Sequence, residues 1–255
     1  MTGGVMCRAH DEGRRVVLVT ATRGEEGEIH NMDEAAARPR LAEIRTEELR
    51  KATAILGVDQ QVFLGYRDSG MAGTPSNDKP GSFHSAPLAD AAILLAEILR
   101  EERPDVVVTY DPKGTYGHPD HVKAHQVTFA ALDLMLLTGA GWRPRKVYMH
   151  GFRKSGLAEF QRQMEAAGRS NPLRDLDIGI DDADITTVVD VRRYLDRKRK
   201  AFAAHVSQND PNSPFLKAPP DWYEAAFGTE TYVLARGQPG GPLPETDVFA
   251  GTDRG

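Results

Sequence analysis

The chain has 255 residues, of which 40% are hydrophobic and 27% charged, and its formal net charge at pH 7 is −5. This length suits one large domain, or a domain with a small cap, with enough apolar residues to bury a core. The acidic balance argues against nucleic acid or an anionic membrane as a partner. One cysteine excludes an internal disulfide, and no apolar run is long enough for a membrane span or a signal-peptide core. The composition favours a cytoplasmic enzyme and leaves a homo-oligomer open.

The predicted elements alternate between helices and strands. Hydrophobic periodicity and turn residues predict helices at 4–12, 41–56, 88–102, 122–137 and 192–205, and strands at 15–20, 61–64, 105–110, 146–150 and 186–189. This alternation predicts a Rossmann-like three-layer α/β fold, an open and mostly parallel sheet with helices on both faces, plus a small C-terminal extension. We expect one domain over residues 1–237. Residues 238–255 are rich in Gly, Pro and Asp, and we expect a loosely packed or unpacked tail.

The most informative motif is Thr-Tyr-Gly-His-Pro-Asp-His at residues 115–121, soon after the predicted strand 105–110. Pro119 suits the first turn of a helix, so His118 and His121 lie on a strand-to-helix turn. Ligands of open α/β sheets bind at this carboxyl edge. Two imidazoles and the Asp120 carboxylate there are a natural half of a zinc site.

Each histidine also has a structural interpretation. An isolated histidine before a helix can be a cap or a hydrogen-bonded surface group. His125 follows His121 by four residues, a spacing that can chelate a metal on one helix face, but a packed histidine explains it better. The close grouping of His118, Asp120 and His121 favours function.

Taken together, several motifs resemble the PIG-L/LmbE-like zinc de-N-acetylases, which include the deacetylase and the conjugate amidase of mycothiol metabolism. The matching blocks are Thr-Arg-Gly-Glu-Glu-Gly-Glu at 22–28, Arg-Thr-Glu-Glu-Leu at 45–49, Arg-Asp-Ser-Gly-Met-Ala-Gly-Thr at 67–74, Val-Val-Thr-Tyr-Asp-Pro at 107–112 and Tyr-Gly-His-Pro-Asp-His at 116–121. Ala-His-Val-Ser-Gln at 204–208 and Pro-Glu-Thr-Asp-Val-Phe-Ala-Gly at 244–251 are most similar to the conjugate amidase.

The resemblance implies removal of an N-acetyl or acyl group from a glucosamine-containing substrate with Zn²⁺ as cofactor. It implies that His121 is a zinc ligand and that His118 donates a hydrogen bond to the developing oxyanion. Asp120 would accept from His118 and orient it, and Tyr116 would act beside the scissile carbonyl. These roles make Tyr116, His118 and Asp120 the expected catalytic residues.

The resemblance also implies a sugar pocket lined by Glu28, Arg45, Asp68 and Met71, facing the histidines. Each has a structural alternative: Glu28 an exposed acidic loop, Arg45 an ion pair with Glu48, Asp68 the start of a turn, and Met71 an ordinary core side chain. The long loop 65–87 that carries two of them is either functional or disordered.

The family's Ala-His-Pro-Asp-Asp-Glu motif, which carries two of three zinc ligands and the general base, has no match in the chain. The chain opens with a helix, so we expect a preceding strand and this motif upstream of Met1. The alternative is a truncated or non-catalytic sugar-binding homologue that lacks two metal ligands and the general base. A nucleotide-binding protein is disfavoured, because no Gly-x-Gly-x-x-Gly follows a predicted strand.

Overall fold

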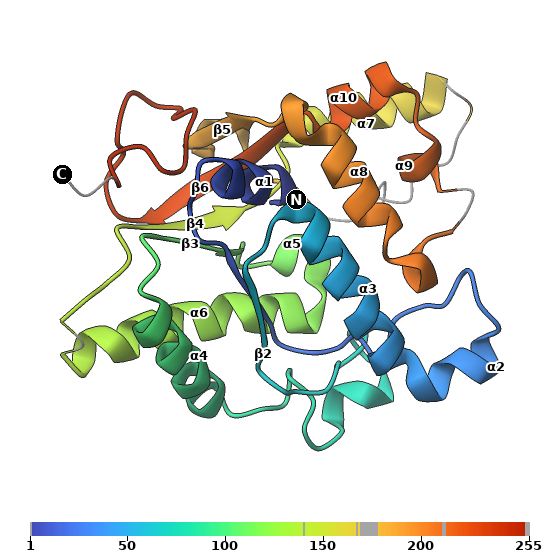
Figure 1. Cartoon of the computed structure of the whole chain (residues 1–255), viewed down its shortest axis with the longest axis horizontal. Helices are drawn as coiled ribbons and strands as arrows, with labels where there is room; N and C mark the ends of the chain where they lie inside the picture. The colour runs from blue at the N-terminus through green and yellow to red at the C-terminus, as the bar shows by residue number, and fades with distance from the viewer. Residues whose placement is uncertain (1, 140, 167, 169–177, 211–212, 253–255) are drawn as a thin grey trace. The chain divides into compact units, whose positions relative to one another are not determined.

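The computed structural model describes residues 2–139, 141–166, 168, 178–210 and 213–252 (Figure 1). Its backbone divides into two compact units, each assembled from separate stretches of the chain. Unit 1 contains Leu88–Asp190 and the chain from Thr229 onward, and unit 2 contains Thr2–Pro87 and Val191–Gly228. Met1, at which the sequence raised the question of a preceding strand, lies outside the described residues.

Unit 1 is built on a four-stranded mixed sheet (Figure 1). Its strands are β3 (Val106–Tyr110), β4 (Lys146–His150), β5 (Thr187–Asp190) and β6 (Thr229–Arg236), in the spatial order β3-β4-β6-β5. The β3–β4 pair is parallel, and β6 runs antiparallel to both of its neighbours. The α/β prediction is confirmed, and the C-terminal strands add an antiparallel part that the sequence pattern did not indicate.

Two helices of unit 1, α4 (Leu88–Glu102) and α6 (Pro119–Leu137), pack against each other (Figure 1). Small and apolar residues recur at helical spacing on the buried face of each helix. An apolar stripe of this kind is shielded from water only when it packs against another element. Leu137 ends the predicted helix 122–137 but is 86% exposed, two residues beyond the last buried apolar residue, Met135. The other helical segments of this unit are α5 (Gly114–Gly117), α7 (Lys154–Ala166) and η3 (Asp182–Asp184).

Unit 2 contains a parallel pair of strands, β1 (Val17–Thr20) and β2 (Gln60–Phe63). Helix α3 (Leu41–Leu56) contacts α1 (Gly3–Asp11) and α8 (Leu195–Ala203). The shorter segments are α2 (Glu34–Ala37), η1 (Arg38–Arg40), η2 (Pro75–Asp78), η4 (Arg192–Tyr194), η5 (Val206–Gln208), α9 (Pro214–Lys217) and α10 (Pro220–Phe227).

The boundaries of three elements agree with the prediction residue for residue. These are α3, α4 and β4, and α3 ends where expected because Gly57 takes the left-handed conformation at φ 80°. The predicted helix 192–205 divides into η4 and α8, and the loop 65–87 contains the short helix η2. Strand β6 was not predicted at all. In the described part of the chain, no helix combines the length and hydropathy that crossing a bilayer requires.

Residues 238–244 of the C-terminal segment are exposed, whereas residues 245–252 are anchored in unit 1 by buried side chains, so the prediction of a loosely packed tail is wrong for this second part. Glu245, Val248 and Thr252 are each at most 3% exposed. Glu245 forms an isolated parallel bridge with Thr187 on β5. The segment thus extends the sheet edge, a long-range pairing that its Gly- and Pro-rich composition does not reveal.

Candidate active site

The His motif lies at the carboxyl end of a parallel strand pair, as predicted. Tyr110 ends β3 and pairs in register with His150, which ends β4. A short turn and α5 follow β3, and α6 begins at Pro119 with that proline in its first turn. The strand-to-helix geometry therefore brings the motif to the edge at which ligands of α/β sheets bind.

His118 is the N-cap residue of α6. Its Nδ1 accepts a hydrogen bond from the backbone N–H of Asp120 at 3.2 Å. An accepting Nδ1 carries no proton, so in the neutral ring the proton is on Nε2, which can donate. This hydrogen bond runs in the opposite direction from the expected one, because the Asp120 backbone donates to the ring, and acceptance from His118 by the Asp120 carboxylate stays a prediction. The Asp120 residue itself is buried, at 7% exposure.

His121 is held in the opposite tautomer. Its Nδ1 lies 3.2 Å from the carbonyl oxygen of Gly114, which can only accept, so Nδ1 carries the proton. The ring stacks on Tyr110, with centroids 4.2 Å apart and planes 17° apart. The lone pair is then on Nε2, the arrangement found in metal-bound histidines whose other nitrogen donates to a carbonyl.

Tyr116 completes a ring cluster with these two histidines. Its ring centroid is 5.1 Å from that of His121 and 6.1 Å from that of His118, and Tyr116 is 39% exposed. A phenol, a donating imidazole and an imidazole with its lone pair on Nε2 thus lie within a short stretch of chain. Together they can donate to a carbonyl oxygen, receive a proton or hold a metal.

Sequence reasoning missed two neighbours of this cluster, Tyr110 and His150. The Tyr110 ring contacts both His121 and His150, and burial raises the pKa of its phenol to about 12. Burial also lowers the pKa of His150 to about 3, so this imidazole is neutral at physiological pH. Their signal in the sequence was their position: both end adjacent predicted strands.

The turn that carries the motif is strained at Thr115. This residue has φ 68° and ψ −58°, is 4% exposed, and its hydroxyl has no hydrogen-bond partner among the described residues. Such a backbone costs about 1–3 kcal/mol for a side chain with a Cβ and is typical of functional sites. The surrounding contacts must therefore impose it.

The described residues do not assemble a complete metal site. Nowhere in the described ranges do three or more His, Cys, Asp or Glu side chains gather in a metal-holding group. The Nδ1 of His125 donates to the carbonyl oxygen of Tyr110 at 2.9 Å, which supports a packed histidine over a chelating one. A catalytic zinc site normally has three protein ligands. His121 fits as one of them, but the described residues around it do not provide the other two.

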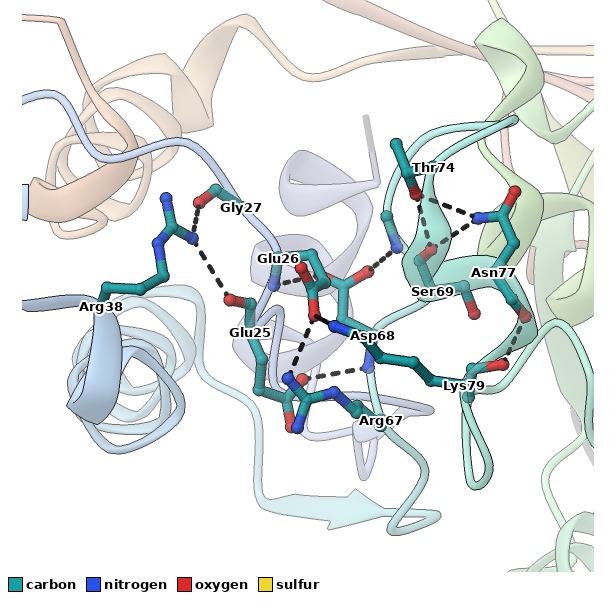
Figure 2. Close-up of polar contacts among 12 residues, drawn as sticks. Glu25, Glu26, Gly27, Arg38, Arg67, Asp68, Ser69, Thr74, Asn77 and Lys79 are labelled. Carbon is teal, nitrogen blue, oxygen red and sulfur yellow. Dashed lines mark hydrogen bonds and ion pairs between the residues drawn. The ribbon is translucent and has the colours of Figure 1, made fainter.

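Asp68, expected in the sugar pocket, lies in a network of unit 2 (Figure 2). It is 6% exposed, and its carboxylate accepts the backbone N–H of Gly70 at 2.9 Å and that of Glu26 at 3.3 Å. The carboxylate of Glu25 accepts the N–H of Asp68 at 3.1 Å. Asp68 does start a turn, the structural alternative, yet each oxygen keeps a second lone pair for a substrate hydroxyl.

Glu25 and Glu26, in the loop 22–28, are both half-buried. Glu26 pairs with Arg67 at 3.1 Å and with Lys79 at 3.6 Å (Figure 2). Burial opposes ionisation of Glu26, but the hydrogen bonds from Arg67 and Ser76 and the charges of Lys79 and Arg67 together outweigh it and lower the carboxyl pKa. The two loops 22–28 and 67–71 are thereby tied together, which the sequence did not indicate.

Arg45 binds the loop 22–28 and does not pair with Glu48 as its structural alternative supposed. Its Nη1 donates to the carbonyl oxygen of Gly24 at 2.8 Å, while both carboxylate oxygens of Glu48 accept from Ser207, at 2.6 and 2.8 Å. Burial, and next the charge of Arg45, lower the pKa of His205. The conjugate-amidase-like block at 204–208 therefore lies near Arg45.

Glu28 is exposed and Met71 is about half exposed. The Glu28 side chain is 86% exposed, with its carboxylate 3.2 Å from Nε2 of His30. Met71 is 47% exposed, so its interpretation as a core side chain is wrong. Asn77 donates to the backbone carbonyl of Met71 at 3.1 Å and fixes that part of the loop. Because these residues belong to unit 2 and the His motif to unit 1, the facing of the two sets stays a prediction.

A family model, PIG-L: GlcNAc-PI de-N-acetylase, matches residues 1–132. Among solved structures, N,N'-diacetylchitobiose deacetylase from Pyrococcus horikoshii superposes with a TM-score of 0.59 at 22% identity, covering 91% of this chain and 77% of that one. A conserved protein from Thermus thermophilus gives a TM-score of 0.57 at 22% identity, with 97% and 90% covered. These two likenesses support the α/β fold.

Two curated relatives share the name 1D-myo-inositol 2-acetamido-2-deoxy-alpha-D-glucopyranoside deacetylase. The protein from Acidothermus cellulolyticus is 41% identical, with 99% of this chain and 90% of the relative covered. The protein from Thermomonospora curvata is also 41% identical, with 98% and 91% covered. At this identity over nearly the whole chain, the conclusion is plain: the protein belongs to the PIG-L family of de-N-acetylases.

Proposed function

We propose that the protein is a metal-dependent hydrolase of a non-peptide amide that removes the N-acetyl group from a glucosamine-containing substrate. The observation that carries the proposal is the 41% identity to named deacetylases across almost all of the chain. The ring cluster of Tyr116, His118 and His121 supplies the chemistry, since amide hydrolysis needs donors for the carbonyl oxygen and the leaving amine.

Three side chains have distinct roles in this proposal, and the tautomer of His118 decides the role of its ring. His118 donates from Nε2 to the oxyanion, because its Nδ1 is already an acceptor. Tyr116 is partly exposed on the same turn and donates from its phenol beside the scissile carbonyl. Asp120 orients His118 through the helix start. Electrostatic stabilisation of this kind acts on the transition state and so raises kcat.

We propose Zn²⁺ as the metal, with Nε2 of His121 as one of its ligands. A donating Nδ1 fixed on a backbone carbonyl favours this choice of nitrogen. A further solved structure, at 16% identity and a TM-score of 0.52, is the zinc-inhibited form of teicoplanin deacetylase Orf2, so zinc acts on a protein with this fold. Among the described residues, no group of three or more His, Cys, Asp or Glu side chains supplies the other ligands.

The substrate we propose is the acetylated inositol glucosaminide for which the curated relatives are named, acted on in the cytoplasm. Asp68 and Arg45 would accept from and donate to its sugar hydroxyls, and Glu28 and Met71 would line the exposed side of the pocket. The carboxylate of Asp68 and the fork of Arg45 match vicinal hydroxyls well. A mycothiol conjugate is the competing substrate, because the block 204–208 lies near Arg45.

The test is release of free amine from the acetylated inositol glucosaminide by the purified chain, with and without added Zn²⁺, beside a mycothiol conjugate in a parallel series. We expect zinc-dependent amine release, faster with the glucosaminide, and none from His121→Ala. Zinc content measured on the same samples shows whether His121→Ala has lost metal. Absence of amine release from the wild type at saturating zinc would contradict the proposal.

One observation favours a second candidate, a sugar-binding relative without hydrolysis. The described residues gather fewer than three metal ligands in any one place. Such a protein would bind the glucosaminide in calorimetry with the same affinity before and after chelator treatment, and would release no amine. Hydrolysis that follows zinc content would exclude it.

A further inference from the structure

The turn between β3 and α6 adopts a conformation that few sequences hold unaided. Gly114 has φ 63°, Thr115 has φ 68° and Gly117 has φ 85°. Glycine takes such angles without strain, but a residue with a Cβ does not. Thr115 is one of two non-glycine residues with positive φ in the described part of the chain. Some contact must therefore keep Thr115 in place.

Asp111 makes that contact. The residue is 8% exposed, and its Oδ1 accepts the backbone N–H of Thr115 at 3.0 Å. Its own carbonyl oxygen accepts the N–H of Gly114 at 2.9 Å. Asp111 thus binds both residues of this left-handed pair, one through its side chain and one through its backbone.

The same turn presents a carbonyl group to His121. The oxygen of Gly114 lies 3.2 Å from Nδ1 of that ring. A Cβ on Gly114 would lie 2.6 Å from the backbone nitrogen of Val122 and 2.8 Å from Cβ of His121, so the turn sits directly on the first turn of α6. Any relaxation at Thr115 would move this carbonyl, because it belongs to the adjoining peptide group.

We propose that Asp111 is a positioning residue for His121: by holding Thr115 in its strained conformation, it keeps the Gly114 carbonyl on Nδ1 and fixes the Nε2 lone-pair tautomer. The importance of Asp111 for catalysis rests on the proposed function, whereas its effect on the His121 tautomer does not. His118 and His125 provide contrasts in the same molecule, because the backbone N–H of Asp120 and the carbonyl of Tyr110 hold their rings independently of Thr115.

The test is the tautomer of each histidine, read from the ¹⁵N spectrum of the chelator-treated full chain at about pH 8, where imidazole is ordinarily neutral. In the wild type we expect the proton of His121 on Nδ1. Asp111→Ala should shift it towards Nε2, and Asp111→Asn should restore it, because the amide oxygen still accepts from Thr115. His125 should keep its Nδ1 proton throughout and reports that β3 and α6 remain folded.

Asp182→Ala is the matched control, since that carboxylate also accepts a backbone N–H, from Ser155 at 3.1 Å. It should leave the His121 tautomer unchanged. If Asp111→Ala unfolds, so that His125 loses its pattern too, Asp111→Glu takes its place, because the longer side chain misplaces the accepting oxygen while keeping the charge. A His121 proton that stays on Nδ1 in a folded Ala or Glu variant would overturn the proposal.

Activity separates this proposal from the proposed function. If the enzyme hydrolyses the glucosaminide, Asp111→Ala should lower kcat by more than it raises KM, with recovery in Asp111→Asn, because a misplaced His121 affects the reacting atoms and not the sugar pocket. An equal effect of the Ala and Asn variants on kcat would count against positioning. If the wild type proves inactive, the proposed function fails while the tautomer shift still decides the role of Asp111.

Discussion

His118 and His121 are three residues apart, and their backbone contacts assign them opposite tautomers. The first accepts on Nδ1 from the N–H of Asp120, and the second donates from Nδ1 to the oxygen of Gly114. The two rings therefore present different groups from Nε2, a proton on His118 and a lone pair on His121. This difference supports the division into an oxyanion donor and a metal ligand that the resemblance implied, and which remains to be tested.

Two substitutions of His118 separate its catalytic role from its role at the helix start. His118→Ala removes both, and the lost N-cap should lower the free energy of unfolding by about 1 kcal/mol. His118→Asn keeps a capping side chain and should hold stability near the wild-type value. Both should lower kcat by about 10²–10³-fold, the usual effect of losing one oxyanion donor.

Steady-state kinetics, urea unfolding and zinc content measured on both variants check this prediction. Zinc content should not change in either variant. Loss of zinc from His118→Ala would mean that the two histidines have exchanged roles, and wild-type kcat in His118→Asn would exclude His118 as the donor.

Gly24 shows how a glycine serves a neighbouring side chain. It has φ 72°, and a Cβ there would lie 1.8 Å from Nη1 of Arg45. Gly13 has the same φ of 72° but nothing within 4 Å of its Cβ position. The pair therefore separates the cost of left-handed backbone from the cost of displacing Arg45.

We expect Gly13→Ala to destabilise the protein by about 1–2 kcal/mol through backbone strain alone. Gly24→Ala should cost more than Gly13→Ala and should also raise KM, because the Arg45 guanidinium loses its place on the loop. Chemical denaturation and KM measurements on the two variants provide the comparison. Equal stability losses, with KM unchanged, would show that Arg45 adapts freely.

At the scale of elements, the C-terminal segment is fixed by a buried ion pair. The carboxylate of Glu245 lies 2.7 Å from Nζ of Lys146 on β4, and their side chains are 1% and 3% exposed. The hydroxyl of Tyr148 and the N–H of Gly240 also donate to this carboxylate, at 2.8 and 2.6 Å. Burial opposes ionisation of Glu245, but the bonds from Lys146, Gly240 and Tyr148 prevail and lower its pKa.

Removing one partner should destabilise the protein more than removing both. Glu245→Gln or Lys146→Met leaves a buried charge without its counter-charge, which typically costs about 3–5 kcal/mol. The double variant Lys146→Met/Glu245→Leu should recover most of that loss. Urea unfolding at pH 7 measures all three, and a double variant as unstable as the sum of the singles would show that the two side chains act independently.

The same pair predicts a pH dependence of stability. The folded pKa of Glu245 is below its ordinary value of 4.5, so its stabilising contribution is complete above that pH. The contribution is lost as the pH falls through the folded pKa, because the unfolded chain binds the proton first. Unfolding free energies from pH 7 down to pH 3 should therefore decline less steeply in the Lys146→Met/Glu245→Leu variant than in the wild type.

At the scale of the whole molecule, neither unit is a continuous piece of chain. Unit 2 ends at Pro87, resumes at Val191 and ends again at Gly228, while unit 1 takes the stretches between and after. The domain boundaries predicted at 1–237 and 238–255 do not follow this division, and the single domain stays a prediction. The physical basis of this prediction is that each unit carries a segment inserted between two stretches of the other, residues 88–190 in unit 2 and residues 191–228 in unit 1. Unfolding of either unit therefore frees both ends of a segment that belongs to the other.

Calorimetry should accordingly show one cooperative transition, with calorimetric and van't Hoff enthalpies about equal. The His121→Ala variant offers a control in which the site, but not the chain path, is altered, and its transition should remain single. Two resolved transitions would mean that the units fold separately and would refute the single domain.

Local patterns in the sequence determined the elements around the site. The helical spacing from Leu41 to Leu56 and the left-handed stop at Gly57 fixed α3, and Pro119 after a strand marked the start of α6. These features depend on neighbours within a few residues, so a sequence displays them directly. The same reasoning placed His118 and His121 at the sheet edge.

Tertiary structure decided what depends on residues far apart in the chain. Strand β6 exists through antiparallel pairing with β4 and β5, and Glu245 is buried through Lys146, 99 residues away. Arg45 donates to the Gly24 carbonyl, 21 residues earlier in the chain, whereas spacing along the helix suggested a pair with Glu48. Each polar group takes whichever partner remains once water is excluded, and spacing along the chain does not encode that choice.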